Sequence, residues 1–242
     1  MKDMHILVIN LEKNKERMAF MDRQLKALGL AYERIPAVYG ATLTKDERKK
    51  CFARFHSFLA MGYPLAPGEI GCSLSHLICY KRILSEGWDG ALILEDDAAL
   101  EPGFDRTADS IRSVRAKGRP QVFILSCLGG SHIQNDTPSV ERIGGAMGAE
   151  GYWISREAAE LLVRANDPVV TVADKWNRWV GRYGLELYRV WPTTVWQDNA
   201  TFGTEINTWR RKRPTGLRWI FRKVCRVPEV FLDWLWFKVT GQ

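Results

Sequence analysis

Apolar and polar residues follow two different periods along the first two hundred residues of the chain. Continuous apolar runs such as HILVIN (5–10) and ALIL (91–94) are typical of strands that are buried on both faces. Between such runs, apolar residues recur three and four positions apart, which indicates helices. The clearest helix opens at Pro67 and closes at Gly87.

The same pattern places the other elements. We expect further strands at 31–38, 121–126, 150–155 and 185–197, and further helices at 11–29, 104–116 and 156–165. Residues 41–66 predict irregular helix or a mobile loop, and residues 128–149 predict a long loop or hairpin over the site. Strands alternating with helices predict an α/β fold with a mainly parallel sheet that binds ligands at the carboxyl ends of its strands.

Composition and charge divide the chain into two parts. Its 242 residues, 46% hydrophobic and 26% charged, suit a soluble globular domain with an appendage. The whole excess charge of +7 lies in residues 209–242, which hold nine Lys and Arg against two acids. Residues 1–208 hold 26 basic and 26 acidic side chains, so they predict a neutral domain that binds no nucleic acid.

The cysteines and the N-terminus favour a reducing compartment. Five cysteines without CxxC spacing argue against both a disulfide framework and a zinc site. The apolar run at residues 5–10 is too short for a signal peptide or a membrane span, so we expect a cytoplasmic location.

The tail, residues 209–242, interleaves its basic residues with Trp and Phe. Charges interrupt each of its apolar runs, so none can cross a bilayer. This pattern is typical of interfacial helices, and we expect the tail to bind the anionic inner face of the cytoplasmic membrane. The alternative is that its aromatic residues pack on the domain or form a dimer contact.

Three acids, Glu95, Asp96 and Asp97, directly follow the apolar run 91–94. Buried carboxylates are costly unless a cation neutralises them, and their hard oxygen atoms suit Mn²⁺ or Mg²⁺ bound to nucleotide phosphates. Alternation along an extended strand would put Glu95 and Asp97 on one side and Asp96 on the other. A solvated strand end with ordinary surface acids is the competing interpretation.

Five separated blocks carry a resemblance to a known family. HILVINLEKNKERMAFMDRQLKALGLAYERIPAV, PGEIGCSLSHLICYKRIL, ALILEDDAAL, GYWIS and VWQ stand in the order and spacing seen in glycosyltransferase family 25, and together they span about residues 4–200. That family comprises bacterial lipooligosaccharide sugar transferases and is related to the collagen galactosyltransferases.

The resemblance implies a single GT-A-like, Rossmann-like nucleotide-sugar-binding domain with a UDP-sugar donor and Mn²⁺ (or Mg²⁺). The implied reaction is an inverting transfer of galactose from UDP-galactose to a lipid-linked lipooligosaccharide or lipopolysaccharide core acceptor. Transfer of glucose from UDP-glucose and a non-catalytic nucleotide-sugar-binding scaffold remain alternatives. A Rossmann-type oxidoreductase is excluded because no GxGxxG follows the first strand.

The resemblance also assigns roles to particular residues. Asp97 is assigned as a metal ligand, and Glu95 as a second ligand or a contact to the donor. Glu69, Ser73 and His76 share one helix face by their i, i+4, i+7 spacing and would form a wall of the donor site. Ser75 lies away from that stripe, and Cys72 and Cys79 are expected to pack in the core. The expected donor contacts are Val8, Asn10, Leu11, Arg17, Glu69, Ser73, His76, Glu95 and Asp96.

For several of these residues an ordinary role competes with the functional one. Arg17 suits a phosphate or base contact, or else a solvated helix face, and Asn10 suits a strand-end turn. The general base that deprotonates the acceptor is expected to be Asp174, with Asp198 as the alternative. A helix N-cap is the competing role for Asp174. Trp176 and Trp179 are candidate platforms for the acceptor sugar.

Overall fold

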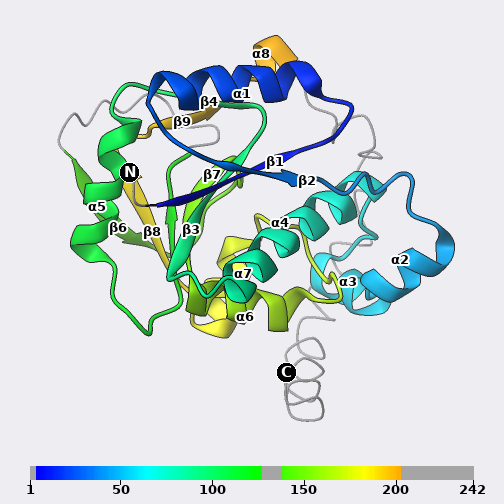
Figure 1. Cartoon of the computed structure of the whole chain (residues 1–242). Helices are drawn as coiled ribbons and strands as arrows, with labels where there is room; N and C mark the ends of the chain where they lie inside the picture. The colour runs from blue at the N-terminus through cyan, green and yellow to red at the C-terminus, as the bar shows by residue number, and fades with distance from the viewer. Residues whose placement is uncertain (1–3, 127–137, 203–242) are drawn as a thin grey trace.

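The computed structural model describes residues 4–126 and 138–202 and contains a seven-stranded sheet of order β2-β1-β3-β7-β5-β8-β6 (Figure 1). Five strands run in one direction, whereas β6 and β7 run in the other. The predicted fold class, α/β with a mainly parallel central sheet, is therefore confirmed. The strands are β1 (His5–Asn10), β2 (Glu33–Pro36), β3 (Gly90–Glu95), β5 (Gln121–Ile124), β6 (Ser139–Ile143), β7 (Gly151–Ser155) and β8 (Glu186–Trp191).

Helices cover both faces of the sheet (Figure 1). Helix α1 (Lys15–Ala27) and helix α5 (Thr107–Val114), which follows the short turn η1 (Phe104–Arg106), contribute to one apolar cluster. Helices α4 (Pro67–Ser85), α6 (Arg156–Asn166) and α7 (Trp176–Tyr183) contribute to the other. Each cluster packs against one face of the sheet, so the core has two halves with the sheet between them.

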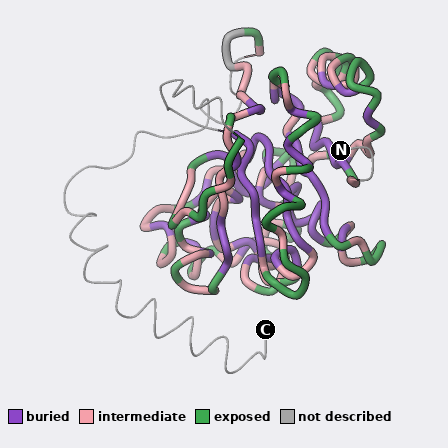
Figure 2. Tube along the Cα trace, turned by 90° about the vertical axis from the view of Figure 1, so that its left-hand side faces the viewer, coloured by how far each residue is buried: buried purple, intermediate pink, exposed green. Residues whose placement is uncertain are grey.

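The central strands explain the continuous apolar runs in the sequence. In β1, Ile6 and Val8 belong to the cluster on the α1 side, whereas Leu7 and Ile9 belong to the cluster on the α4 side. Both faces of the strand are buried, and so no polar position interrupts the run. Figure 2 shows buried residues along the chain segments at the centre and exposed residues mainly on the surrounding helices and loops.

Several segments refine the sequence prediction or differ from it. Residues 41–66, expected as irregular helix or a mobile loop, contain two short helices, α2 (Lys45–Cys51) and α3 (Arg54–Met61), and the expected loop or hairpin at 128–149 contains the edge strand β6. The strand expected at 185–197 is two strands, because β8 ends before Pro192 and β9 (Val195–Gln197) pairs instead with β4 (Ala98–Leu100). A last short helix, α8, covers Asn199–Phe202.

The predicted basic and aromatic tail, residues 209–242, lies outside the described residues. Within the parts of the chain that the structure describes, no helix is long and apolar enough to cross a membrane.

Candidate functional site

The sheet register brings the acid motif to one edge of the domain. Asn10 pairs with Pro36 and Ile9 pairs with Glu95, so β1, β2 and β3 end at the same edge. Beside this edge lies a cavity of about 120 Å³, between the strand ends and helix α4. The site therefore lies where open α/β sheets bind their ligands.

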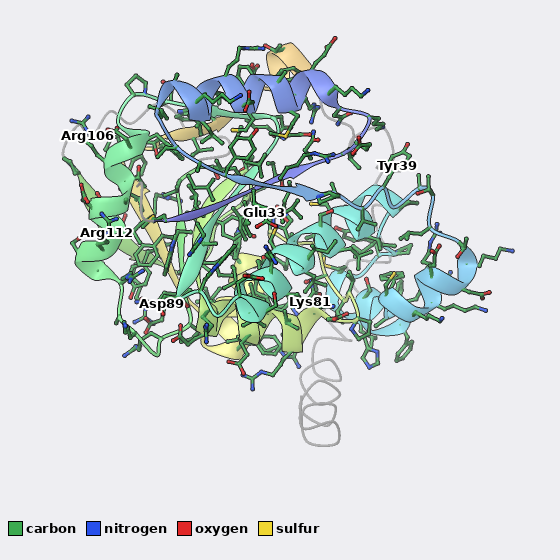
Figure 3. The ribbon with its side chains drawn as sticks, viewed as in Figure 1. Glu33, Tyr39, Lys81, Asp89, Arg106 and Arg112 are labelled. Atoms are coloured by element: carbon green, nitrogen blue, oxygen red, sulfur yellow. The ribbon has the colours of Figure 1, made fainter. Side chains whose placement is uncertain are left out.

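The cavity has an apolar wall and an acidic floor. The floor holds all three acids of the motif, Glu95, Asp96 and Asp97. In Figure 3, Tyr39 lies on the segment between β2 and α2, at the outer side of the ribbon, and the Lys13 amine lies 4.3 Å from its ring centroid. The wall includes Ile9, Leu11, Ala37, Val38 and Tyr39.

The Arg17 guanidinium pairs with two acids of the motif. Its Nη1 donates to Asp96 Oδ1 at 3.3 Å and to Asp97 Oδ2 at 3.1 Å. The strand ends at Glu95 and a turn follows, so Asp96 and Asp97 approach the same guanidinium. The expected alternation, which put Asp96 on the opposite side from Asp97, is therefore wrong.

Asp97 is buried, yet one of its two carboxylate oxygens lacks a hydrogen-bond partner. Its Oδ2 accepts hydrogen bonds from Arg17 and, at 3.2 Å, from Gln197 Nε2. Its Oδ1 is buried without a hydrogen-bond partner in the structure. Such an oxygen atom, next to other carboxylates, is what a hard divalent cation would bind.

The charge on the motif is disfavoured in the absence of further cations. Burial, and then the neighbouring charges of Asp97 and Asp96, raise the pKa of Glu95 to about 8. Burial also raises the pKa of Asp96 and of Asp97, although hydrogen bonds and the charge of Arg17 oppose the shift. A bound cation would reverse these shifts by favouring the ionised carboxylates.

Glu150 is a buried acid beside the motif that the sequence analysis did not identify. Its carbonyl oxygen accepts the Glu95 amide at 2.9 Å, and its carboxylate accepts from Ser126 Oγ at 2.9 Å. Burial and then the charge of Glu95 raise the pKa of Glu150 to about 8. Glu150 immediately precedes β7, which runs antiparallel to β3, so the start of this strand lies at the site. In a parallel strand that start would have been at the opposite edge.

The helix face that lines the cavity agrees with the predicted one only at His76. Gly68, Cys72, Ser75 and His76 line it, whereas Glu69 and Ser73 do not. Glu69 Oε2 accepts the Ala66 amide, and Ser73 Oγ donates to the carbonyl oxygens of Glu69 and Thr171. The predicted donor contacts of Glu69 and Ser73 are therefore corrected to structural roles.

His76 joins the acid motif to a pair of tyrosines. Its Nε2 lies 3.3 Å from Glu95 Oε1, and its Nδ1 lies 2.7 Å from the Tyr152 hydroxyl. The hydroxyls of Tyr152 and Tyr80 are 2.8 Å apart. Burial lowers the pKa of His76 to about 4, so the ring is neutral at physiological pH.

The predicted contacts from the first strand separate into two groups. Leu11 and Arg17 line the cavity. Asn10 supports the motif instead, because its Nδ2 donates to Asp96 Oδ2 at 2.7 Å and to the carbonyl of Asn14. Val8 packs in the core on the α1 side of the sheet, so its predicted contact with the donor is wrong.

The two candidate bases have different surroundings. Asp174 Oδ2 accepts the Gly148 amide at 3.2 Å, and its charge acts on both Glu95 and His76. The N-cap of α7 is Lys175, so Asp174 does not cap that helix. Asp198 Oδ1 accepts the Thr201 amide at the start of α8, and its own amide donates to the Asp97 carbonyl.

The two tryptophans do not form an acceptor platform. Trp176 is 0% exposed and Trp179 is 1% exposed, and the Trp176 indole donates to the Gly148 carbonyl at 2.7 Å. Neither ring has a free face on which a sugar can stack, so this expectation is corrected.

Comparison with known sequences identifies the family. The sequence profile described as Glycosyltransferase family 25 (LPS biosynthesis protein) matches residues 3–176. The chain belongs to glycosyltransferase family 25. The predicted resemblance is thereby confirmed, and the match includes the acid motif, helix α4 and Glu150.

Relatives in the family include much longer proteins. A glycosyltransferase 25 family member of Aedes aegypti is 38% identical over 170 residues, which is 66% of this chain and 28% of the relative. Procollagen galactosyltransferase 1 of Danio rerio is 29% identical over 171 residues, again 66% of this chain and 28% of the relative. This family 25 chain thus spans under a third of the length of these relatives.

Two solved structures of glycosyltransferases have a low overall similarity to this chain. One is a mutant Drosophila β1,4-galactosyltransferase 7 with manganese, UDP-Gal and xylobiose (TM-score 0.39, 12% identity, 88% of this chain and 82% of that one). The other is a glycosyltransferase involved in glycosylation of the major capsid of PBCV-1 (TM-score 0.35, 12% identity, 75% of this chain and 76% of that one).

Proposed function

We propose that this family 25 chain is an inverting, metal-dependent transferase that moves a hexose from a UDP-sugar to a saccharide acceptor. The observation that carries the proposal is the buried carboxylate of Asp97, whose Oδ1 has no hydrogen-bond partner, beside Glu95 and Asp96 on the cavity floor. A site that concentrates buried carboxylates next to an apolar wall suits a cation together with a nucleotide diphosphate.

The residues fit the implied metal. Asp97 would hold Mn²⁺ or Mg²⁺ through Oδ1, and Glu95 is the second ligand. When bound, the ion would supply Lewis-acid stabilisation of the charge that develops on the departing UDP. Asn10 donates a hydrogen bond to Asp96 at 2.7 Å, and Gln197 donates one to Asp97 at 3.2 Å. These bonds hold the two carboxylates in place.

The other groups of the cavity divide the remaining tasks. The apolar wall around Ile9, Leu11 and Tyr39 suits the base and ribose of the donor. Arg17 lies close enough to the acids to interact with a diphosphate bound there. The neutral His76 ring lies with its Nε2 3.3 Å from Glu95 Oε1, so His76 orients the carboxyl group of Glu95.

Asp174 is the proposed base, and Asp198 is the alternative. A base must take the proton of the acceptor hydroxyl as that oxygen attacks the anomeric carbon. Asp174→Asn should lower kcat at least about 100-fold while UDP affinity changes little. Asp198→Asn is the matched comparison: retained turnover in Asp174→Asn, with loss in Asp198→Asn, would assign the base to Asp198.

Galactose is the proposed sugar, and a lipopolysaccharide or lipooligosaccharide core is the proposed acceptor. The galactosyltransferase names of relatives support the first proposal, and the family description supports the second. UDP-glucose is the alternative donor. A screen of both donors with purified protein and truncated lipooligosaccharide acceptors, read as UDP release, distinguishes them.

A non-catalytic scaffold is the competing function. Both functions predict that UDP binds more tightly with Mn²⁺ than with a chelator, as isothermal titration would measure. A transferase also releases UDP in the presence of a suitable acceptor. Metal-linked binding without turnover on the acceptors screened would favour the scaffold, whereas metal-independent UDP binding would contradict the proposed site.

A further inference from the structure

Three side chains of different chemistry converge in the cavity, where α4 meets the end of β3. Cys72 and His76 lie four residues apart on α4, and Glu95 lies at the end of β3. One potential ligand atom from each, a sulfur, an imidazole nitrogen and a carboxylate oxygen, lies within 4.8 Å of the other two. The cysteine spacing along the sequence gave no sign of this group, because two of its members come from one helix face and the third from a strand.

The imidazole is already oriented for a cation. Its Nδ1 lies 2.7 Å from the Tyr152 hydroxyl, and that hydroxyl lies 2.8 Å from the Tyr80 hydroxyl. With hydrogen on Nδ1 donated to Tyr152, Nε2 directs its lone pair toward Glu95. A ligating histidine in a metal site is commonly held by such a hydrogen bond from its other ring nitrogen.

The spacing suits a four-coordinate ion. His76 Nε2 and Glu95 Oε1 are 3.3 Å apart, which is close to the separation of two ligand atoms bonded at about 2.0–2.1 Å in a tetrahedral site. Cys72 Sγ lies within 4.8 Å of both atoms and would bond such an ion at about 2.3 Å. All three residues line the cavity, so water can reach a cation that they bind.

The surrounding charge also favours a cation. Besides Glu95, the carboxylates of Asp174, Asp97 and Glu150 act on Cys72. The buried, unpartnered Oδ1 of Asp97 belongs to the same cavity. A divalent ion would stabilise the thiolate and would reduce the repulsion among these acids.

We propose that Cys72, His76 and Glu95 form a binding site for a thiophilic divalent cation, with Zn²⁺ as its representative. The sulfur and nitrogen ligands distinguish it from the oxygen ligands proposed for Mn²⁺ or Mg²⁺ at Asp97. Glu95 is common to the two sites, so a bound Zn²⁺ hinders binding of the donor and its metal. This inhibitory consequence rests on the proposed function, whereas the binding itself does not.

Cobalt is a spectroscopic probe for the proposed site. The chelator-treated, thiol-reduced full chain is titrated with Co²⁺ and should develop thiolate-to-cobalt charge-transfer absorption, which Zn²⁺ then abolishes. Cys72→Ser should remove that absorption, and His76→Gln should weaken Co²⁺ binding at least about tenfold. Cys72→Ala replaces the serine variant if the latter does not fold, as judged by circular dichroism.

Cys51→Ser is the matched control, because Cys51 is a free thiol on α2 outside the cluster. Any of three results would overturn the proposal. The wild-type chain could show no cobalt absorption, the absorption could survive in both Cys72 variants, or it could be lost equally in Cys51→Ser.

A second measurement separates this proposal from the proposed function. In a UDP-release assay with Mn²⁺, Zn²⁺ should inhibit the wild-type chain and Cys51→Ser alike. Cys72→Ser, compared with its own zinc-free rate, should require at least about tenfold more Zn²⁺. Cobalt binding without any turnover would support this site and contradict the proposed transferase function. Turnover without Cys72-dependent cobalt binding would support the transferase function and contradict this site.

Discussion

Asp97 is the residue on which the proposed chemistry depends most. Asp97→Asn keeps the shape of the side chain and removes its charge, so it should lower turnover at least about 100-fold and abolish the effect of Mn²⁺ on UDP binding. Burial raises the pKa of this carboxyl, so the neutral variant should unfold at a Tm no lower than wild type in chelator. Activity assays, titration of UDP and thermal unfolding measure the three effects.

Asp109→Asn is the control for that substitution, because Asp109 is an exposed acid on α5 whose carboxylate pairs with Arg112. It should leave turnover and UDP binding unchanged. Near-normal activity in Asp97→Asn would contradict the metal assignment.

Glu150 should make the stability of the metal-free protein depend on pH. Its pKa is about 8 in the folded chain against an ordinary value of 4.5, so between these values the folded state holds a proton that the unfolded state has released. The free energy of unfolding therefore falls as the pH rises through this range. His76, with its pKa lowered to about 4, acts in the opposite sense only below about 6.5.

Glu150→Gln should remove part of this dependence and keep the hydrogen bond from Ser126. Between pH 6.5 and 8.5, with chelator present, its Tm should fall less than that of the wild-type chain, while Glu95 still contributes. The Tm of Glu141→Gln, a substitution at an exposed position on β6, should fall as much as that of the wild-type chain. Equal slopes in all three proteins would show that Glu150 does not titrate as described.

The sequence predicted the chemistry of single residues better than their partners. The acid motif stands out because three charges follow a buried strand, but its contact with Arg17 joins residues 79 and 80 positions apart. On α4 the prediction identified His76 correctly, but it assigned Cys72 to the core although Cys72 lines the cavity. Helical spacing groups residues into faces, but the packing of the whole helix decides which face meets the site.

At the scale of elements, the segment after β2 is positioned by direct contact of two glycines. A Cβ atom at Gly71 on α4 would meet the Val38 carbonyl oxygen and would lie 2.6 Å from the Gly40 nitrogen. Both obstacles are backbone atoms, so Gly71→Ala must push this part of the cavity wall away from α4. We expect a loss of about 1–3 kcal/mol in the free energy of unfolding and weaker UDP binding.

Gly181→Ala in α7 is the opposite case. A Cβ atom there has nothing within 4 Å, so alanine should stabilise the helix by about 0.5–1 kcal/mol and leave UDP binding unchanged. Urea unfolding and titration of UDP test both variants. A Gly71→Ala protein as stable as wild type would show that the segment and α4 are not in fixed contact.

Elements with a clear hydrophobic period were predicted well, whereas elements defined by the pairing of distant strands were not. Strands β1 and β3 and helix α4 follow from local patterns, because burial on both faces or on one face determines their residues. The pairing of β4 with β9, and the reversed direction of β7, depend on contacts between distant segments. No local pattern encodes them, and the position of Glu150 at the site depends on that reversal.

At the scale of the whole molecule, the predicted two-part organisation gives the tail its own role. Residues 209–242 carry the whole net charge of +7, whereas the domain before them is neutral. We propose that this segment holds the enzyme at the cytoplasmic face of an anionic membrane, where a lipid-linked acceptor would be available. Each Lys or Arg near such a surface contributes about 1 kcal/mol, so several together suffice for reversible binding.

Vesicle co-sedimentation tests this role directly. The full chain should sediment with anionic vesicles at low salt, should be released as salt is raised, and should ignore neutral vesicles, because the attraction of the basic residues is screened by ions. A chain ending at Asn207 lacks all nine basic residues of the tail and should stay in the supernatant under each condition. Equal sedimentation of the two chains would place membrane binding in the domain, and absence of binding by the full chain would favour packing of the aromatic residues on the domain or in a dimer. Turnover on a soluble acceptor should be the same for both chains, since the proposed site lies entirely before residue 203.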